Sequence, residues 1–287
     1  MSTSTVQNRP AGTPAVRPAA GSGVNFLRTL HAEWIKFTTL RSTWILLATT
    51  VVVMVGIGLL GGWGVGSGLE ELAAEGQDPA AVGLDPQLLY MMTTGGIDFG
   101  QLIIGSLGVL LIASEYSTGM IRSTMTAVPD RLSPLFAKAL VIALVAAVVG
   151  VVSSFATYFL MQPILAQYGQ EFGLDVENLV PSMLLSGVYL ALASLIALAL
   201  GALMRNSAGG IVALVVLFLI VPMVLGFIQL DWIQDTLPYL PSNAGRQLLA
   251  LQIADGDLTQ LQGGLVMAAW SAVLLAAAAV VIKRRDV

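Results

Sequence analysis

The chain has 287 residues, of which 56% are hydrophobic and only 10% are charged, and its formal net charge at pH 7 is −4. Soluble domains carry about 25% charged residues, so this chain lacks the polar residues needed to cover the surface of a water-soluble domain. It contains no cysteine, which excludes a disulfide scaffold, thiolate metal ligands and thiol catalysis. The composition therefore predicts a polytopic membrane protein.

Two segments precede the first long apolar stretch. Residues 1–24 are rich in Pro, Ala, Gly, Ser and Thr and contain no apolar run, which predicts a disordered cytoplasmic tail rather than a signal peptide. Residues 25–41 have the pattern of an amphipathic helix, with Lys36 opposite a face formed by Phe26, Leu27, Leu30, Trp34 and Phe37. Such a helix lies in the membrane interface. This interfacial helix, which leads into the first span, is either a simple anchor or also a contact for a partner.

Six long stretches of the chain lack charged residues. A membrane-spanning helix needs about 20 apolar residues, and a backbone in lipid must satisfy its own hydrogen bonds, which favours helices. The stretch between Asp98 and Glu115 is short, so these two residues are expected at the two membrane faces. The sequence predicts an all-α membrane domain over residues 25–287, with six transmembrane helices near residues 43–65, 97–116, 138–161, 182–204, 210–228 and 263–282.

The positions of the basic residues predict the orientation. All but one of the 13 Lys and Arg residues lie before the first span, in the loops after the second and fourth spans, or at the C-terminal end. Because loops rich in basic residues stay on the cytoplasmic side, both termini are predicted to be cytoplasmic. Residues 66–95 and 229–262 are then predicted to be external.

The two large external segments give few signs of chemistry. The first carries five carboxylates without the spacing of a calcium-binding loop, so we interpret it as a solvated acidic face. The second contains Arg246, the one external basic residue, for which Asp235 or Asp255 is the expected partner. Its apolar residues predict a short helix that dips toward the membrane, formed around Leu248, Leu249, Leu251 and Ile253.

Several kinds of chemistry are absent from the sequence. No lysine follows the glycines of a phosphate-binding loop, so the chain is not expected to bind or hydrolyse ATP. The single histidine, His31, has no companions of metal-ligand type, and no metal or cofactor site is expected. Two glycine pairs with G-x-x-x-G spacing, Gly58 with Gly62 and Gly96 with Gly100, are expected at helix contacts. The chain is predicted to be a non-enzymatic partner in an energised process.

Residues 114–138 are the most informative stretch. Glu115 lies at the inner end of the second predicted span, where a carboxylate without a partner is costly. Arg122 follows it, and Gly119 between them allows a bend that brings the guanidinium back toward the carboxylate. The sequence thus predicts an ion pair between Glu115 and Arg122. The alternative interpretation is two ordinary charges at a membrane boundary.

Three segments carry a family resemblance. The first reads Glu115-Tyr116-x-x-Gly119-x-Ile121-Arg122, followed by Val128-Pro129-x-Arg131 and Lys138. The second reads Glu33-x-x-Lys36-x-x-x-x-Arg41-Ser42-x-Trp44, and the third reads Leu240-Pro241-Ser242-Asn243-Ala244. In this order they resemble the type-two ATP-binding-cassette (ABC) transporter permeases, which are membrane subunits of small bacterial exporters. The resemblance covers nearly the whole chain after residue 25.

The resemblance implies one half of an ABC exporter in the cytoplasmic membrane of a bacterium. A second permease half, identical or related, would pair with it, and two copies of a separate ATPase subunit would dock on the cytoplasmic face. Membrane lipid is a further partner, nucleic acid is not, and the substrate, hydrophobic or drug-like, is left unidentified. The resemblance assigns coupling to the ATPase to Glu115, Tyr116, Gly119, Arg122 and Arg131. From the interfacial helix it adds Glu33, Trp34, Lys36 and Arg41.

Two other classes of protein stay open at this point. An ion-coupled carrier or an intramembrane enzyme would carry ionisable residues in the middle of its spans, or inverted repeats, and the sequence has neither. A non-transporting membrane scaffold or immunity factor would share every feature described so far. An ATPase gene beside this one would favour the exporter, and its absence would favour the scaffold.

Overall fold

The computed structural model describes residues 25–81, 85, 88, 92–120, 132–253 and 257–284. Within these residues every regular element is a helix and no strand occurs. Six helices are long and apolar enough to span a membrane: Arg41–Ala74, Met92–Ser117, Ser133–Ala166, Leu179–Met204, Ser207–Gly226 and Gln260–Arg284. Each coincides with one predicted span, so the all-α fold with six transmembrane helices is confirmed. The predicted tail, residues 1–24, lies outside the described residues.

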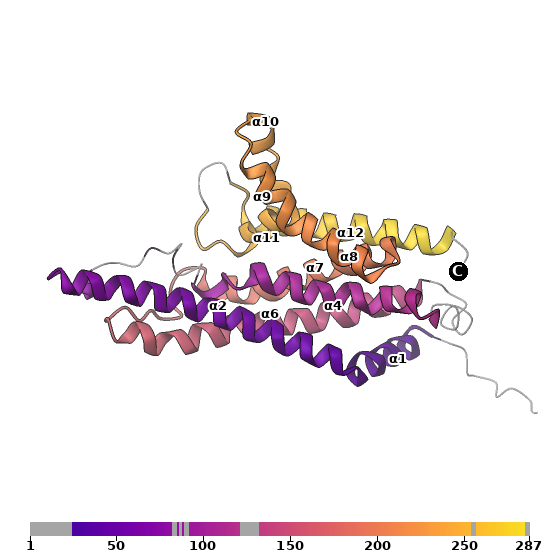
Figure 1. Ribbon diagram of the computed structural model, residues 1–287, viewed down its shortest axis with the longest axis horizontal. Coiled ribbons are helices and arrows are strands. Elements are labelled where there is room, and N and C mark those ends of the chain that lie inside the picture. Colours follow the sequence, from indigo (N-terminus) through magenta and orange to yellow (C-terminus); the bar gives the residue numbers. More distant parts are fainter. Residues whose placement is uncertain are drawn as a thin grey trace, which may run out of the picture.

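The described helices follow one another along the chain as labelled in Figure 1. The first group is α1 (Phe26–Thr39), α2 (Arg41–Ala74), the short 3-10 helix η1 (Pro79–Ala81) and α4 (Ile97–Ser117). The next is α6 (Ser133–Ala166), α7 (Leu179–Met204), α8 (Ser207–Val215), the π-helical η2 (Val216–Ile220) and α9 (Val221–Gly226). The last is α10 (Asp231–Gln234), the 3-10 helix η3 (Leu237–Tyr239), α11 (Pro241–Leu249) and α12 (Gln260–Arg284).

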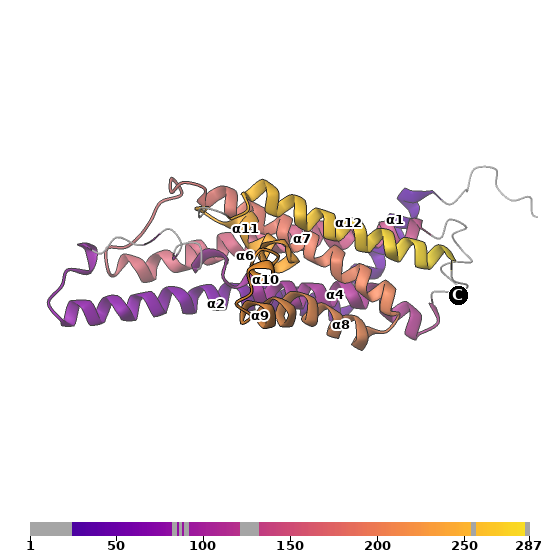
Figure 2. The same ribbon diagram turned by 90° about the horizontal axis from the view of Figure 1, so that it is seen from above.

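Five long helices form an elongated bundle. In Figures 1 and 2, α2, α4, α6, α7 and α12 run along the longest axis of the molecule. Helix α1 and the C-terminal end of α12 lie at the same end of this bundle, which we call the α1 end. Their position on one side agrees with an even number of spans. The side that faces the cytoplasm stays a prediction.

Two of the helices extend well beyond the predicted spans. Helices α2 and α6 each contain 34 residues, which at about 1.5 Å per residue gives roughly 50 Å, against about 30 Å for the hydrocarbon core of a bilayer. The extension of α2 ends near Glu75, because the Leu, Glu and Ala residues before it favour a helix. The hydroxyl of Tyr168 donates to Glu70 Oε1 at 2.6 Å and ties this extension to the residues after α6.

Helix α7 forms the centre of the packing and contacts α4, α6, α11 and α12. Close helix contacts depend on glycine. A Cβ atom at Gly58 would lie 2.2 Å from Thr157 Cγ2 on α6, and one at Gly62 would lie 2.8 Å from Met161 Cγ. A Cβ atom at Gly96 would lie 2.3 Å from the carbonyl oxygen of Met54. The predicted glycine pairs therefore stand where α2 meets α4 and α6.

The fifth span differs from the others. It is built from α8, η2 and α9, which together we call the arm, and it diverges from the bundle toward α10 (Figure 1). A π-helical turn and Pro222 interrupt its α-helical hydrogen bonding, and both features bend helices. The buried residues of the arm are Gly210, Leu214 and Phe218, and α9 has none.

The segment after the arm folds back over the bundle. Helix α11 packs against α7 and α12, and it ends at Leu249, so the predicted short helix exists but Leu251 and Ile253 follow it. Arg246 on this helix pairs with Asp98 at the start of α4, through Nη2 to Oδ2 at 2.9 Å and Nε to Oδ1 at 3.2 Å. The sequence suggested Asp235 or Asp255 instead, because it considered carboxylates close along the chain. Asp255 lies outside the described residues.

Candidate functional site

The sequence of α1 directs a carboxylate toward the bundle. Glu33 is 5% exposed and shares the buried face of α1 with Thr29 and Phe37, at a spacing of four residues that places all three on one side of a helix. The predicted apolar residues Phe26, Leu27 and Trp34 are exposed instead. They point away from the other helices, as expected for an interfacial helix whose apolar surface faces lipid.

Local hydrogen bonds fix the ends of α1. The side chain of Asn25 accepts a bond from the backbone N–H of Arg28 at 3.0 Å and caps the first turn. At the other end Leu40 is extended between α1 and α2, and the indole of Trp44 donates to the carbonyl of Thr38 at 2.9 Å. This contact holds α1 at an angle to the first span, where a continuous helix would otherwise place Glu33 elsewhere.

Helices α4 and α6 bring two further charged side chains to the same place. Glu115 lies in the last turn of α4 and is 3% exposed. Lys138 lies in the second turn of α6, which has Pro134 in its first turn, and is 4% exposed. Charged side chains that are so well buried are costly unless they are paired.

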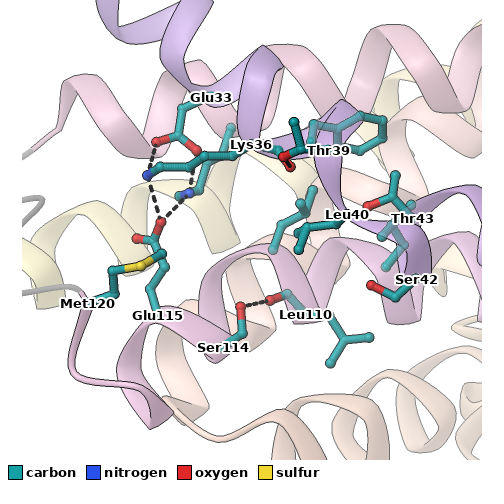
Figure 3. A pocket seen from close by; sticks show the side chains of 14 residues that line it. Glu33, Lys36, Thr39, Leu40, Ser42, Thr43, Leu110, Ser114, Glu115 and Met120 are labelled. Atoms are coloured by element: carbon teal, nitrogen blue, oxygen red, sulfur yellow. Dashed lines mark hydrogen bonds and ion pairs between the residues drawn. The ribbon is translucent and has the colours of Figure 1, made fainter.

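These residues form a closed arrangement of alternating charges, which we call the charge ring (Figure 3). Lys138 Nζ donates to Glu33 Oε2 at 2.5 Å and to Glu115 Oε1 at 2.8 Å. Lys36 Nζ donates to Glu33 Oε1 at 2.9 Å and to Glu115 Oε1 at 3.1 Å. Each ammonium group therefore bridges both carboxylates, and α1, α4 and α6 are joined through side chains.

The charge ring has no net charge, because two carboxylates face two ammonium groups. Removing one member of a buried ion pair leaves an uncompensated charge, which costs about 3–5 kcal/mol. The contact is therefore sensitive to any movement that separates its three helices. Lys36 is the most exposed member, with 38% of its side chain accessible. The group thus has one wet edge and a buried interior.

Lys36 is also the member of the ring that lies outside the spanning helices. Its burial lowers the pKa of the ammonium group, but the hydrogen bond to Glu33 and the negative charges of Glu115 and Glu33 act in the opposite direction and prevail. The pKa of Lys36 is therefore raised above its ordinary value of 10.5. Lys36 stays protonated at physiological pH, as bridging two carboxylates requires.

A second polar contact lies next to the ring. The guanidinium of Arg205 stands 5.2 Å from the centre of the Tyr116 ring, within the range of a cation–π interaction. Arg205 has a left-handed backbone with φ of 52° and ends α7. This contact joins the last turn of α4 to the connection between α7 and the arm. The sequence analysis gave Arg205 no role, although a lone arginine between two apolar spans was a usable signal.

The structure brings together only some of the predicted site residues. Glu33, Lys36 and Glu115 meet in the charge ring, and Tyr116 lies beside it. Trp34 is 46% exposed and stacks on Phe37, with the ring centroids 6.2 Å apart. Arg41 begins α2 and is exposed. Neither Trp34 nor Arg41 contributes a side chain to the ring.

The loop after α4 gives a partial outcome. Gly119 has φ of 72° and follows the C-terminal end of α4, so the chain turns at the residue where a bend was predicted. Arg122 and Arg131 lie outside the described residues, so their roles stay predictions, as does the Glu115–Arg122 pair. The partners that the structure gives Glu115 are Lys36 and Lys138.

Sequence reasoning quoted Lys138 as part of the resemblance but assigned it no function. Its partners lie 23 and 105 residues away in the sequence, so no local spacing connects them. The available signal was a single lysine inside the first two turns of an otherwise uncharged helix. A lysine in that position needs a partner within the protein.

A cavity of about 320 Å³ lies beside the charge ring, between α1, α2 and α4 (Figure 3). Two of its lining residues carry a buried oxygen atom without a hydrogen-bond partner among the described residues, namely Glu115 Oε2 and Thr43 Oγ1. Over the same part of the chain, no group of three His, Cys, Asp or Glu side chains is arranged to hold a metal ion.

The fold and the site together define an all-helical polytopic membrane protein whose buried charges join three helices at one end of the bundle. The sequence pattern of the ABC-2 family transporter proteins matches residues 29–223, a segment that contains all four members of the charge ring. This match covers more than half of the chain, so the chain belongs to that family. It is a membrane permease of an ABC transporter, a kind of protein that generally works with an ATPase partner. A search among curated proteins finds no significant match.

Proposed function

We propose that the chain is the membrane half of an ATP-driven exporter in the cytoplasmic membrane of a bacterium. Two copies of a separate ATPase subunit bind at the α1 end, and a second permease half, a second copy or a related chain, completes the pathway. The substrate is hydrophobic or drug-like. Chemical work is done by the ATPase, and the chain converts it into movement of the helices.

The charge ring is the observation that carries this proposal. It connects α1, which lies across the end of the bundle, to the ends of α4 and α6 that flank residues 118–132. A force applied to that loop or to α1 would reach the spanning helices through these buried charges, because separating them is costly. Side chains without partners would transmit no such force. The ring therefore supports coupling at the α1 end.

Purification of the chain with the ATPase encoded beside it tests the proposal. A detergent-solubilised complex, reconstituted into liposomes, should hydrolyse ATP and export a reporter from a panel of amphipathic dyes. The chain alone should hydrolyse none. If no ATPase co-purifies from the native membrane under mild conditions, the chain is a scaffold rather than an exporter subunit, and the proposal fails.

The orientation is tested with single cysteines, since the chain has none of its own. Ser117 and Gln77 are both exposed, at the α1 end and beyond the far end of α2 respectively. On whole cells, a membrane-impermeant thiol reagent should label Gln77→Cys and spare Ser117→Cys. After the cells are opened it should label both. The reverse pattern on whole cells would place the α1 end outside and contradict ATPase docking there.

A further inference from the structure

The cavity beside the charge ring has two chemically different walls. One wall is apolar and comes mainly from α4, where Leu107, Leu110 and Leu111 share a face. The other consists of the charge ring at one end and of Thr43 toward the start of α2 (Figure 3). The cavity is as large as the smaller ligand pockets of proteins, which begin at about 300 Å³. A molecule that fills it must be amphipathic.

The polar wall has an unused acceptor. Both lysines of the ring are fully engaged with carboxylates, and Glu33 uses both of its oxygens. Glu115 uses only Oε1, although its side chain is 4% exposed and Oε2 is buried. In Figure 3 this free oxygen points away from the ammonium groups, toward Met120 on the cavity lining. A buried carboxylate oxygen without a donor is costly, so the site favours a ligand that donates hydrogen bonds.

The free oxygens determine the class of ligand. An anion would meet a ring whose positive charges are already neutralised and a carboxylate that repels it. A primary ammonium group satisfies Glu115 Oε2 through a charge-assisted hydrogen bond. The hydroxyl of Thr43, on the other side of the cavity, can donate to an acceptor such as a phosphate oxygen. An ammonium and a phosphate joined by a short linker match this arrangement.

The position of the cavity determines the source of the ligand. It lies under α1, whose residues Phe26, Leu27 and Trp34 are exposed apolar side chains of the interfacial type. It also lies at Leu40, where α1 ends and the first span begins. This is the depth at which phospholipid headgroups stand in a bilayer, with acyl chains extending along the spans. The adjacent molecules at this level are membrane phospholipids.

We propose that this cavity binds the headgroup of an aminophospholipid such as phosphatidylethanolamine. Its ammonium group donates to Glu115 Oε2, its phosphate accepts from the hydroxyl of Thr43, and the beginning of its acyl chains lies against Leu107, Leu110 and Leu111. The lipid completes the polar contacts of the charge ring without breaking them. The inference concerns binding alone, so it does not depend on the proposed export.

The experiment measures lipid binding to the purified, delipidated full chain by native mass spectrometry and by the shift in its thermal unfolding midpoint. The probes are phosphatidylethanolamine, its N,N-dimethyl derivative, phosphatidylcholine and phosphatidylglycerol with identical acyl chains, and soluble phosphoethanolamine. One charge-assisted hydrogen bond corresponds to a preference of about tenfold or more for phosphatidylethanolamine over phosphatidylcholine, which has no N–H donor. Soluble phosphoethanolamine should not compete, because it cannot use the apolar wall.

Two variants place the binding at this cavity. Glu115→Gln should reduce the preference for phosphatidylethanolamine over phosphatidylcholine to near unity. Leu110→Trp fills the cavity, leaves the charge ring intact and should abolish the preference even if Glu115→Gln folds poorly. Leu60→Trp serves as the matched control, because Leu60 is 66% exposed on α2 and does not line the cavity. It should bind as the wild type does.

Four results would overturn the proposal. Equal binding of phosphatidylethanolamine and phosphatidylcholine would mean that water satisfies Glu115 Oε2. Stronger binding of phosphatidylglycerol would identify an anion site, and competition by phosphoethanolamine would identify a soluble ligand. A preference that survives Leu110→Trp would place the lipid elsewhere. Loss of ATPase binding or transport in a separate assay would not change any of these readings, so failure of export and failure of this site are distinguishable.

Discussion

The α1 end and the arm are built on opposite principles. At the α1 end, Glu33, Glu115 and Lys138 are all buried and satisfied by partners from other helices. In the arm, residues 207–226, only 17% of the apolar window is buried, and Val212 and Met223 are more than half exposed. The first region is defined by a few specific contacts between charges, and the second by general apolar character.

The difference shows which parts of a membrane protein must be specific. Apolar side chains on the arm are stable against lipid tails, so few contacts with the bundle are needed. Buried charges have no such alternative, because lipid offers them no partner. We therefore expect substitutions to be severe at the α1 end and mild in the arm. The predictions below test this contrast, beginning with the largest expected effect.

The largest loss of stability is expected for Lys138→Met. It leaves Glu33 and Glu115 close together with only Lys36 between them, and the unfolding free energy in detergent should fall by about 3–5 kcal/mol. The matched control is Lys283→Met in the last turn of α12, where the lysine is exposed and the change should stay within about 0.5 kcal/mol. Equal effects of the two substitutions would show that the ring is not energetically important.

A double variant sharpens this test. Lys138→Met combined with Glu115→Leu removes one charge of each sign, and Glu33 keeps Lys36 as its partner. Replacing a buried ion pair by apolar residues is often close to neutral. The double variant should therefore be more stable than Lys138→Met alone. Additive losses would mean that the two residues act independently.

The next effect compares two glycines. A Cβ atom at Gly150 on α6 would lie 2.6 Å from the carbonyl oxygen of Ser186 on α7, whereas one at Gly226 on α9 would meet nothing within 4 Å. Gly150→Ala should cost about 1–3 kcal/mol through overpacking. Gly226→Ala should be neutral or stabilising by up to about 1 kcal/mol, because alanine favours a helix. Thermal unfolding of both variants checks the opposite signs, and equal signs would remove the contrast in packing.

The smallest effect concerns the pH dependence of Lys36. Because its pKa is raised above 10.5 in the folded chain, its contribution to stability is complete below pH 10.5 and is lost as the pH rises through the higher, folded value. The difference in unfolding midpoint between wild type and Lys36→Met should therefore be constant from about pH 8 to pH 10. It should shrink above that. A difference that shrinks below pH 10 would contradict the assignment.

The sequence predicted the fold well for a physical reason. Each span needs about 20 uncharged residues, so stretches such as those in α7 and α12 can be located from composition alone. The contacts between helices are a different matter. The charge ring joins Lys138 to Glu33 across 105 residues, and no periodicity within one helix indicates such a partner.

The same limit explains the other differences. Arg246 was expected to find a carboxylate nearby along the chain, but the return of α11 over the bundle brings it to Asp98. The arm has an ordinary apolar sequence, and its departure from the bundle depends on the π-helical turn and on the packing of its neighbours. Gly119 was predictable, because a positive φ is a local property of glycine.

The central claim is that the charge ring transmits force from an ATPase to the spanning helices. The most direct test is Glu115→Gln in the reconstituted complex, with ATPase binding, ATP hydrolysis and transport measured on the same preparation. The matched control is Glu70→Gln, which removes a carboxylate at the exposed contact with Tyr168. Glu115→Gln should reach the membrane and bind the ATPase at wild-type levels but lose about tenfold or more of its transport, the value of one charge-assisted hydrogen bond. Full transport by Glu115→Gln, or an equal loss in Glu70→Gln, would contradict the claim.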